Sequence, residues 1–341
     1  MSGQRSPQGR WYRNLFSSFA VSAVVGLLTS CSSISQYERT QEVVHTLQEV
    51  DRQFTIEDTS TASFPDDKGA KIWIHHALAL MPHSAMPYIG DADQPGLVAI
   101  LEMRGRYPLL IDLLKRAVAD PKIRLDQQYY SLLLALADAE ERVGPTSGAS
   151  KTYADALVQI NKSVGKAGDT FDPNSSLLLD RARAEYYGGR KPQALKDFQS
   201  IITTDPENAP AAKNDMAYFL ALDKTNLSQA KTLATEAVAE ARKQGDDDVI
   251  GMYEDTLAWV DHQQGNDKDA LYYEQEAASL IPLMADVQYH LGAICVADGQ
   301  DLQAKVAFTR AIKLDPYFSE ARSALQALPS SPVDVQSKLE S

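Results

Sequence analysis

The chain has 341 residues, of which 44% are hydrophobic and 23% are charged, a composition typical of folded globular proteins. Its formal charge of −13 opposes non-specific binding to nucleic acid or to anionic lipid. Two cysteines, Cys31 and Cys295, are too few for a disulfide framework or a thiolate metal cluster.

Residues 1–30 have the features of an export signal. Three arginines and no acidic residue lie in the first 13 positions, and a short apolar run then ends at Leu28. The run is shorter than the ~20 apolar residues that a membrane span needs, which favours a removed signal peptide over a permanent transmembrane helix. Its removal would make the mature chain more negative by three charges.

The end of this signal, Leu28-Thr29-Ser30-Cys31, resembles the lipobox of bacterial lipoproteins. In that family the cysteine becomes the acylated first residue of the mature protein. The resemblance implies a diacylglyceryl group on the Cys31 thiol and, usually, a further chain such as palmitate on its amine, which together anchor stably in a bilayer. Ser32 follows instead of Asp, which in this family favours the periplasmic face of the outer membrane in a Gram-negative host. An ordinary signal peptide with a chance cysteine is the alternative.

Residues 31–90 are predicted to form a short polar tether, over 32–36, and then the N-terminal helices. Val43, Leu47, Val50 and Phe54 recur on one face of an amphipathic helix. Residues 56–69 are polar and rich in turn formers, which predicts a loop.

The densest histidine cluster follows, with His75, His76 and His83 near Trp73. His83 comes after Pro82, which is expected to end the helix that carries the other two. No Asp, Glu or Cys at ligand spacing completes a metal site, so ordinary helix and turn histidines are the favoured interpretation and no metal is expected.

Residues 91–166 fit two degenerate TPR-like helical hairpins, one with its turn at Gly105 and the other with its turn at Gly144. Leu97 precedes the first glycine, and Leu110 and Leu114 follow it. Residues around Gly144 could instead be two unrelated helices joined by the segment 144–148. The segment 167–176 is expected to be a linker.

The clearest pattern lies in residues 285–318, a 34-residue segment with a glycine, Gly299, at its centre. Gly292 and Ala304 are small where two antiparallel helices must approach closely, and Phe308 is large enough to fill the space between neighbouring hairpins. Pro316 cannot continue the second helix. This pattern resembles one tetratricopeptide repeat (TPR), whose period is also 34 residues.

A repeat of this kind cannot bury its apolar face alone, and similar units precede it. Gly189 and Gly265 centre two of them, and the unit between has no glycine and one extra residue in its turn, 223–227. We therefore expect about four repeats over 175–328, closed by a C-terminal capping helix, and a disordered tail over 329–341. The predicted fold is all-α, a right-handed superhelical solenoid of antiparallel helix pairs. A helical bundle is the alternative, but it does not require these residues to recur in register.

The resemblance to TPR proteins implies a concave groove lined by the first helix of each pair, which binds an extended segment or short helix of a protein partner. The positions that this resemblance assigns to the groove are Arg183, Tyr186, Tyr187, Asn214, Tyr218, Asp255, Trp259, His262, Gln263, Asp286 and Tyr289. Filling of space between adjacent hairpins is an alternative role for the aromatic residues. Cys295 is expected to be an inert core residue.

Motifs of the common phosphate-binding loops, zinc peptidases, redox CxxC sites and serine hydrolases do not occur in the sequence. We therefore expect a membrane-anchored scaffold that binds protein partners in the bacterial cell envelope, with no catalysis of its own, no cofactor and no nucleic-acid partner. The alternative is that residues 36–130 form an enzymatic or ligand-binding unit around Trp73, His75, His76 and His83, docked on the repeats.

Overall fold

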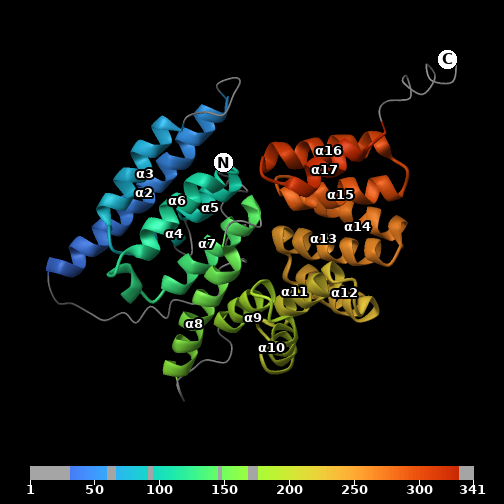
Figure 1. Cartoon of the computed structure of the whole chain (residues 1–341), viewed down its shortest axis with the longest axis horizontal. Coiled ribbons are helices and arrows are strands. Elements are labelled where there is room, and N and C mark those ends of the chain that lie inside the picture. Colours follow the sequence, from blue (N-terminus) through green and yellow to red (C-terminus); the bar gives the residue numbers. More distant parts are fainter. Residues whose placement is uncertain (1–30, 60–66, 91–94, 145–147, 168–175, 330–341) are drawn as a thin grey trace. The chain divides into compact units, whose positions relative to one another are not determined.

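The computed structural model describes residues 31–59, 67–90, 95–144, 148–167 and 176–329. This part of the chain contains sixteen α-helices and one short 3-10 helix, and no strand longer than the single bridge between Gly90 and Pro95. The prediction of an all-α fold built from antiparallel helix pairs is confirmed (Figure 1). The predicted signal peptide, the linker over 168–175 and the tail from 330 onward lie outside the described residues.

The chain divides into two compact units, 1–194 and 195–341. The first contains α2 (Cys31–Thr59), α3 (Lys68–Leu80), α4 (Met86–Ile89), α5 (Leu97–Met103), α6 (Tyr107–Ala119), η2 (Ile123–Leu125), α7 (Tyr129–Val143), α8 (Ala149–Ala167) and α9 (Leu177–Tyr187). Neighbouring helices pack in sequence order, with α2 on α3, α6 on α7 and α7 on α8. Residues 32–36, expected to be a polar tether, are instead the first turns of α2.

Large aliphatic side chains fill the core of the first unit. The predicted apolar face of α2, which carries Val43, Leu47, Val50 and Phe54, is fully buried. Burial of one such side chain contributes about 1.5–3 kcal/mol. Most of the other large members of this core come from α5, α6 and α7, and they include Leu97, Ile100, Leu101, Leu110, Leu114 and Leu132.

The second unit begins inside α10 (Lys191–Thr204). It continues with three hairpins, formed by α11 (Ala209–Leu222) with α12 (Leu227–Gln244), α13 (Asp247–Gln263) with α14 (Asp267–Leu280), and α15 (Ala285–Ala297) with α16 (Asp301–Leu314). Each hairpin also packs on the next one, α12 against α13 and α14 against α15. The predicted capping helix is α17 (Ser319–Ala327), which buries Ala321 and packs on α16.

One turn geometry joins the helices of successive pairs. In each such turn a residue with positive φ donates its N–H to the carbonyl three residues earlier, and the next N–H bonds to the carbonyl five residues before it. These are the two hydrogen bonds of the Schellman motif, which caps the free carbonyl groups at a helix end. The positive-φ residues are Gly105, Gly189, Lys224, Gly265 and Gly299.

The turn between α11 and α12 explains how a repeat forms there without glycine. Lys224 takes the left-handed conformation, with φ of 52°, that glycine takes in the other turns. Helix α12 starts three residues after this position, whereas α14 and α16 start two residues after Gly265 and Gly299. The extra residue predicted from the sequence is therefore present.

Close helix approach within the last hairpin depends on Gly292. A Cβ atom at this position would lie 2.4 Å from Cε1 of Phe308. The Phe308 ring therefore occupies the space that the side chain of any other amino acid at position 292 would need. Phe308 is 1% exposed and packs with Ala304 and Cys295. The predicted architectural roles of these residues are confirmed, and burial raises the pKa of the Cys295 thiol, which makes it unreactive.

Candidate functional site

Aromatic side chains from three first helices of the second unit gather around one histidine. The ring of Trp259, on α13, stacks on His290 of α15 with 4.1 Å between centroids. The ring of Tyr218, on α11, lies 6.3 Å from the same imidazole. Tyr289 lies 6.2 Å from Trp259. The structure therefore brings together the three aromatic residues that the sequence assigned to the groove of the second unit.

These three aromatic residues differ in how much they also serve as core. Tyr289 packs on Phe318, 4.9 Å away, and burial raises the pKa of its hydroxyl, so it fills space next to the capping helix as well. Trp259 has a polar atom with no such role. Its Nε1 is buried and, among the described residues, has no hydrogen-bond partner. A buried indole N–H normally finds an acceptor, so this unpaired group distinguishes Trp259 from the two tyrosines.

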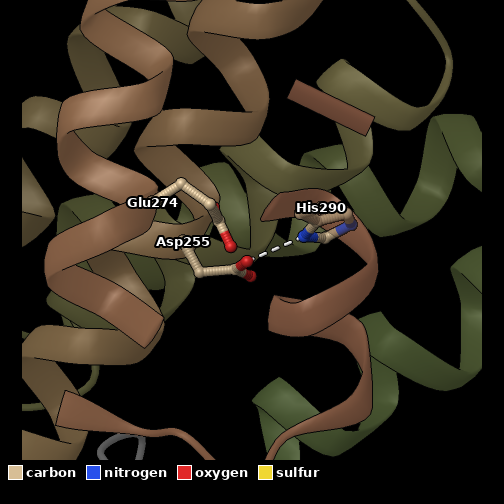
Figure 2. A group of neighbouring side chains, drawn as sticks. All are labelled: Asp255, Glu274 and His290. Carbon is tan, nitrogen blue, oxygen red and sulfur yellow. Dashed lines mark hydrogen bonds and ion pairs between the residues drawn. The ribbon is translucent and has the colours of Figure 1, made fainter. Parts of the chain in front are cut away.

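A polar cluster lies beside this aromatic group, with one side chain from each of three consecutive helices (Figure 2). Asp255 comes from α13, Glu274 from α14 and His290 from α15. His290 Nδ1 and Asp255 Oδ1 are 2.7 Å apart, and one donor atom of each residue lies within 4.8 Å of the others. The side chains of His290 and Asp255 are 4% and 13% exposed, and Glu274 is fully buried.

The environment of Glu274 disfavours its charged form. Burial raises the pKa of this carboxyl well above its usual value, and the charge of Asp255 raises it further. Neither carboxylate oxygen of Glu274 accepts a hydrogen bond from another described residue. An acid that is buried without a donor is costly, so this side chain requires either a proton or a cation.

The remaining predicted groove residues of the second unit lie on the first helices α11, α13 and α15. His262 and Asp267 form a hydrogen bond in which Nδ1 and Oδ1 are 2.7 Å apart. Asn214, on α11, has a buried side-chain oxygen with no hydrogen-bond partner among the described residues. Gln263 and Asp286 are partly exposed.

Three predicted groove residues, Arg183, Tyr186 and Tyr187, belong to α9 of the first unit. Arg183 lies 3.8 Å from the carboxylate of Asp180. Tyr186 is 6% exposed, and Tyr187 is 37% exposed and stacks on Tyr153 of α8. Tyr186 therefore offers little surface to a partner, whereas the ring of Tyr187 remains accessible.

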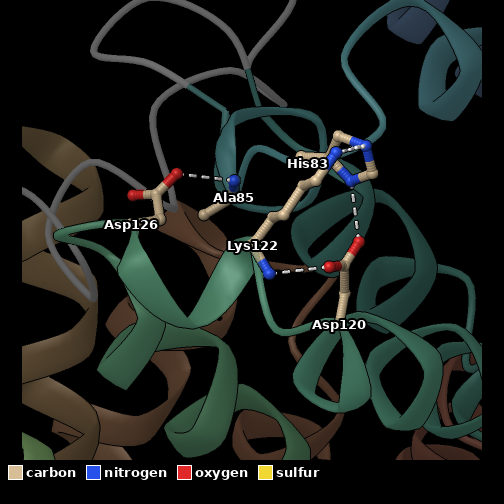
Figure 3. A network of polar contacts seen from close by, with 5 residues as sticks. All are labelled: His83, Ala85, Asp120, Lys122 and Asp126. Carbon is tan, nitrogen blue, oxygen red and sulfur yellow. Dashed lines mark hydrogen bonds and ion pairs between the residues drawn. The ribbon is translucent and has the colours of Figure 1, made fainter.

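The N-terminal histidines have separate surroundings. His75 and His76 lie on the exposed face of α3, and His76 is close to Glu42 and Trp73. His83 instead follows that helix and bonds to Asp120, whose other oxygen accepts the backbone N–H of Lys122 (Figure 3). This network ties the segment after α3 to the segment after α6, which is a structural role. It gives no support to an enzymatic unit around these residues.

Two members of the polar cluster, Glu274 and His290, were missed from the sequence. Glu274 lies on a second helix, which the repeat resemblance places away from the groove, and His290 directly follows the selected Tyr289. The separation of 35 residues between Asp255 and His290, close to the 34-residue repeat period, was the available signal. The distance that separates them in sequence hides their contact.

No protein-family model matches the sequence, and comparison with curated proteins also gives no match. Among solved structures, the chain is similar to the TPR-sensor ATPase of the STAND class from Pyrococcus horikoshii, with 15% identity over 88% of this chain and 49% of that one, and a TM-score of 0.45. It is also similar to BtubC from P. vanneervenii, with 15% identity, 67% and 93% coverage and a TM-score of 0.40. A fragment of MamA from Desulfovibrio magneticus has 19% identity over 54% of this chain and 94% of that one, with a TM-score of 0.38.

These identities and TM-scores are low, so the repeat architecture rests on the recurring turns and helix packing of the chain itself. None of the described helices is long and apolar enough to cross a membrane. Cys31 is the first residue of α2, and the apolar run that precedes it lies outside the described residues.

Proposed function

We propose that the protein is a lipid-anchored scaffold that binds protein partners in the bacterial cell envelope through the first helices of its repeats. The anchor is supported by the sequence, in which a basic start, a short apolar run and the Leu28–Cys31 lipobox follow in order. Acylation of Cys31 would hold the repeats near a bilayer surface. We propose the periplasmic face of the outer membrane for a Gram-negative host.

The observation that carries partner binding is the aromatic group formed by Tyr218, Trp259 and Tyr289. Three helices from three different hairpins contribute to it, and Trp259 carries a buried N–H without an acceptor. Tyrosine and tryptophan are enriched among the residues that dominate binding free energy. An extended segment or a short helix with an apolar anchor would fit such a surface.

Photo-crosslinking from the full chain in its native envelope tests this proposal. A crosslinking amino acid at Gln263, at the end of α13, is expected to capture a specific envelope protein, identifiable by mass spectrometry. The matched control is Tyr272, which is 57% exposed on the second helix α14. Trp259→Ala, made in the chain that carries the crosslinking amino acid at position 263, should weaken partner binding about 30-fold. This is the effect of losing ~2 kcal/mol of binding free energy. Equal captured proteins from both positions, or capture unaffected by Trp259→Ala, would disprove the proposed surface.

The anchor is tested separately. Cys31→Ala should leave an uncleaved precursor that incorporates no radiolabelled palmitate, while the unmodified chain is labelled and fractionates with the outer membrane. Labelling of the Cys31→Ala variant would show that the lipobox assignment is wrong.

A further inference from the structure

The cluster of Asp255, Glu274 and His290 has the composition of a metal site. It supplies two carboxylates and one imidazole from three different helices, with donor atoms within 4.8 Å of one another. Both oxygens of the fully buried Glu274 lack a hydrogen-bond donor among the described residues. The side chain points toward Asp255 and His290, as Figure 2 shows, so a cation held by these two residues would also be within reach of a Glu274 oxygen.

We propose that these three residues bind one divalent transition-metal ion of the Zn²⁺ type. Imidazole and carboxylate together suit Zn²⁺, whereas Mg²⁺ and Ca²⁺ prefer oxygen ligands alone. Three protein ligands leave a fourth tetrahedral position for water. The ion would be the positively charged partner that the buried Glu274 carboxylate does not have among the described residues.

Binding changes the protons of the cluster in a defined way. The proton on the Glu274 carboxyl would be released to solvent as the metal binds. The proton of the neutral His290 imidazole would move from Nδ1 to Nε2, so that the ligands are two carboxylates and a neutral imidazole. The bound ion would join α13 and α14 of one hairpin to α15 of the next.

The competing explanation is a proton-sharing network, in which protonated Glu274 donates to Asp255 and Asp255 also accepts from His290. It leaves one oxygen of Glu274 without a partner, and it predicts no dependence on metal. Glu274→Gln separates the two explanations. The amide keeps the size of the side chain and can donate to Asp255, but it removes a negatively charged ligand.

The experiment titrates the chelator-treated full chain with Zn²⁺ by calorimetry and with Co²⁺ by visible absorption. We expect one saturable site, tetrahedral Co²⁺ bands, and quenching of Trp259, whose ring stacks on His290. Glu274→Gln should weaken metal binding by about 100-fold or more. Loss of an outer-shell partner already costs ~10–100-fold in metal affinity, and Glu274 is proposed as a direct ligand. Zn²⁺ should raise the thermal midpoint of the original chain but not that of Glu274→Gln.

A matched control keeps the test specific. Glu276→Gln changes an exposed acid on the same helix as Glu274 and should keep the site intact. Absence of saturable binding, or equal binding by Glu274→Gln with unchanged circular dichroism, would overturn the proposal and identify a proton-sharing network. Because no partner protein takes part, the result is independent of the proposed scaffold function.

Discussion

The two units use different materials to build the same kind of helical layer. The core of the first unit is made of large aliphatic side chains such as Leu101, Leu110 and Leu114. In the second unit alanines occupy many of the buried positions between helices, and rings such as Phe308 and aliphatic side chains such as Leu257 and Ile294 fill the remaining space. The buried alanines of this unit include Ala230, Ala234, Ala237, Ala258, Ala270, Ala277, Ala304 and Ala311.

This difference shows what makes a repeat recognisable in a sequence. Alanine and glycine are required at fixed positions because the helix backbones lie too close for anything larger, so they recur with the period of the structure. A leucine core has many packing solutions of similar energy, so its positions need not recur. The predictions that follow test this contrast, from the largest expected effect to the smallest.

Loss of a large ring should destabilise the second unit most. Phe308→Ala is expected to lower the free energy of unfolding by about 3–5 kcal/mol, because the Gly292 face that the ring covers has no side chain to fill the cavity. Urea unfolding followed by Trp259 fluorescence, with Trp11 and Trp73 replaced by Phe, measures it. A cost below about 1 kcal/mol would mean that α15 and α16 collapse onto each other, contrary to the rigid packing inferred here.

The converse change, which adds atoms at the contact, should cost about 1–3 kcal/mol. Gly292→Ala places a Cβ 2.4 Å from the Phe308 ring, so the ring or the helix must move. The double variant Gly292→Ala, Phe308→Leu should recover part of this loss relative to the sum of the single changes. Additive costs in the same urea experiment would contradict a direct contact as the cause.

The contrast between the units also explains which features the sequence predicted. The last hairpin was predicted in detail because Gly292, Gly299 and Pro316 each have a single steric reason to be there. The prediction of a tether over 32–36 was wrong because these residues belong to the first turns of α2, a helix whose apolar face becomes clear in the sequence only from Val43. Glu274 and His290 could not be identified as neighbours, because their contact depends on the packing of α14 on α15, which no local pattern encodes.

Acid burial in the first unit should make its stability depend on pH. Burial and the charge of Asp138 together raise the pKa of Glu102 to about 8, against an opposing effect of the charge of Arg142. Since the folded state holds a proton that the unfolded state releases near its ordinary pKa of 4.5, stability should fall as pH rises from about 5 to 8.

Glu102→Gln removes this titration, so the variant should lose less stability over the same interval. We expect a difference of about 1–2 kcal/mol, because the partial exposure of Glu102 screens part of the shift. Unfolding is followed by Trp73 fluorescence with Trp11 and Trp259 replaced by Phe. Parallel pH profiles for the two chains would show that Glu102 titrates normally in the folded unit.

The smallest effect concerns the turns, and it tests whether the glycine-free hairpin is a true equivalent of its neighbours. Gly265 and Lys224 have φ of 79° and 52° in turns with the same pair of hydrogen bonds. A Cβ at Gly265 would meet nothing within 4 Å, so Gly265→Ala changes backbone energy alone and should cost about 1–2 kcal/mol. Lys224→Gly should do the opposite and stabilise the unit by about 0.5–1 kcal/mol, because it relieves a left-handed conformation that a side chain disfavours. Gly299→Ala is the control, expected to match Gly265→Ala. Destabilisation by Lys224→Gly in the Trp259 urea experiment would mean that Lys224 contributes contacts of its own, and that this turn reaches its geometry by a different route from the glycine turns.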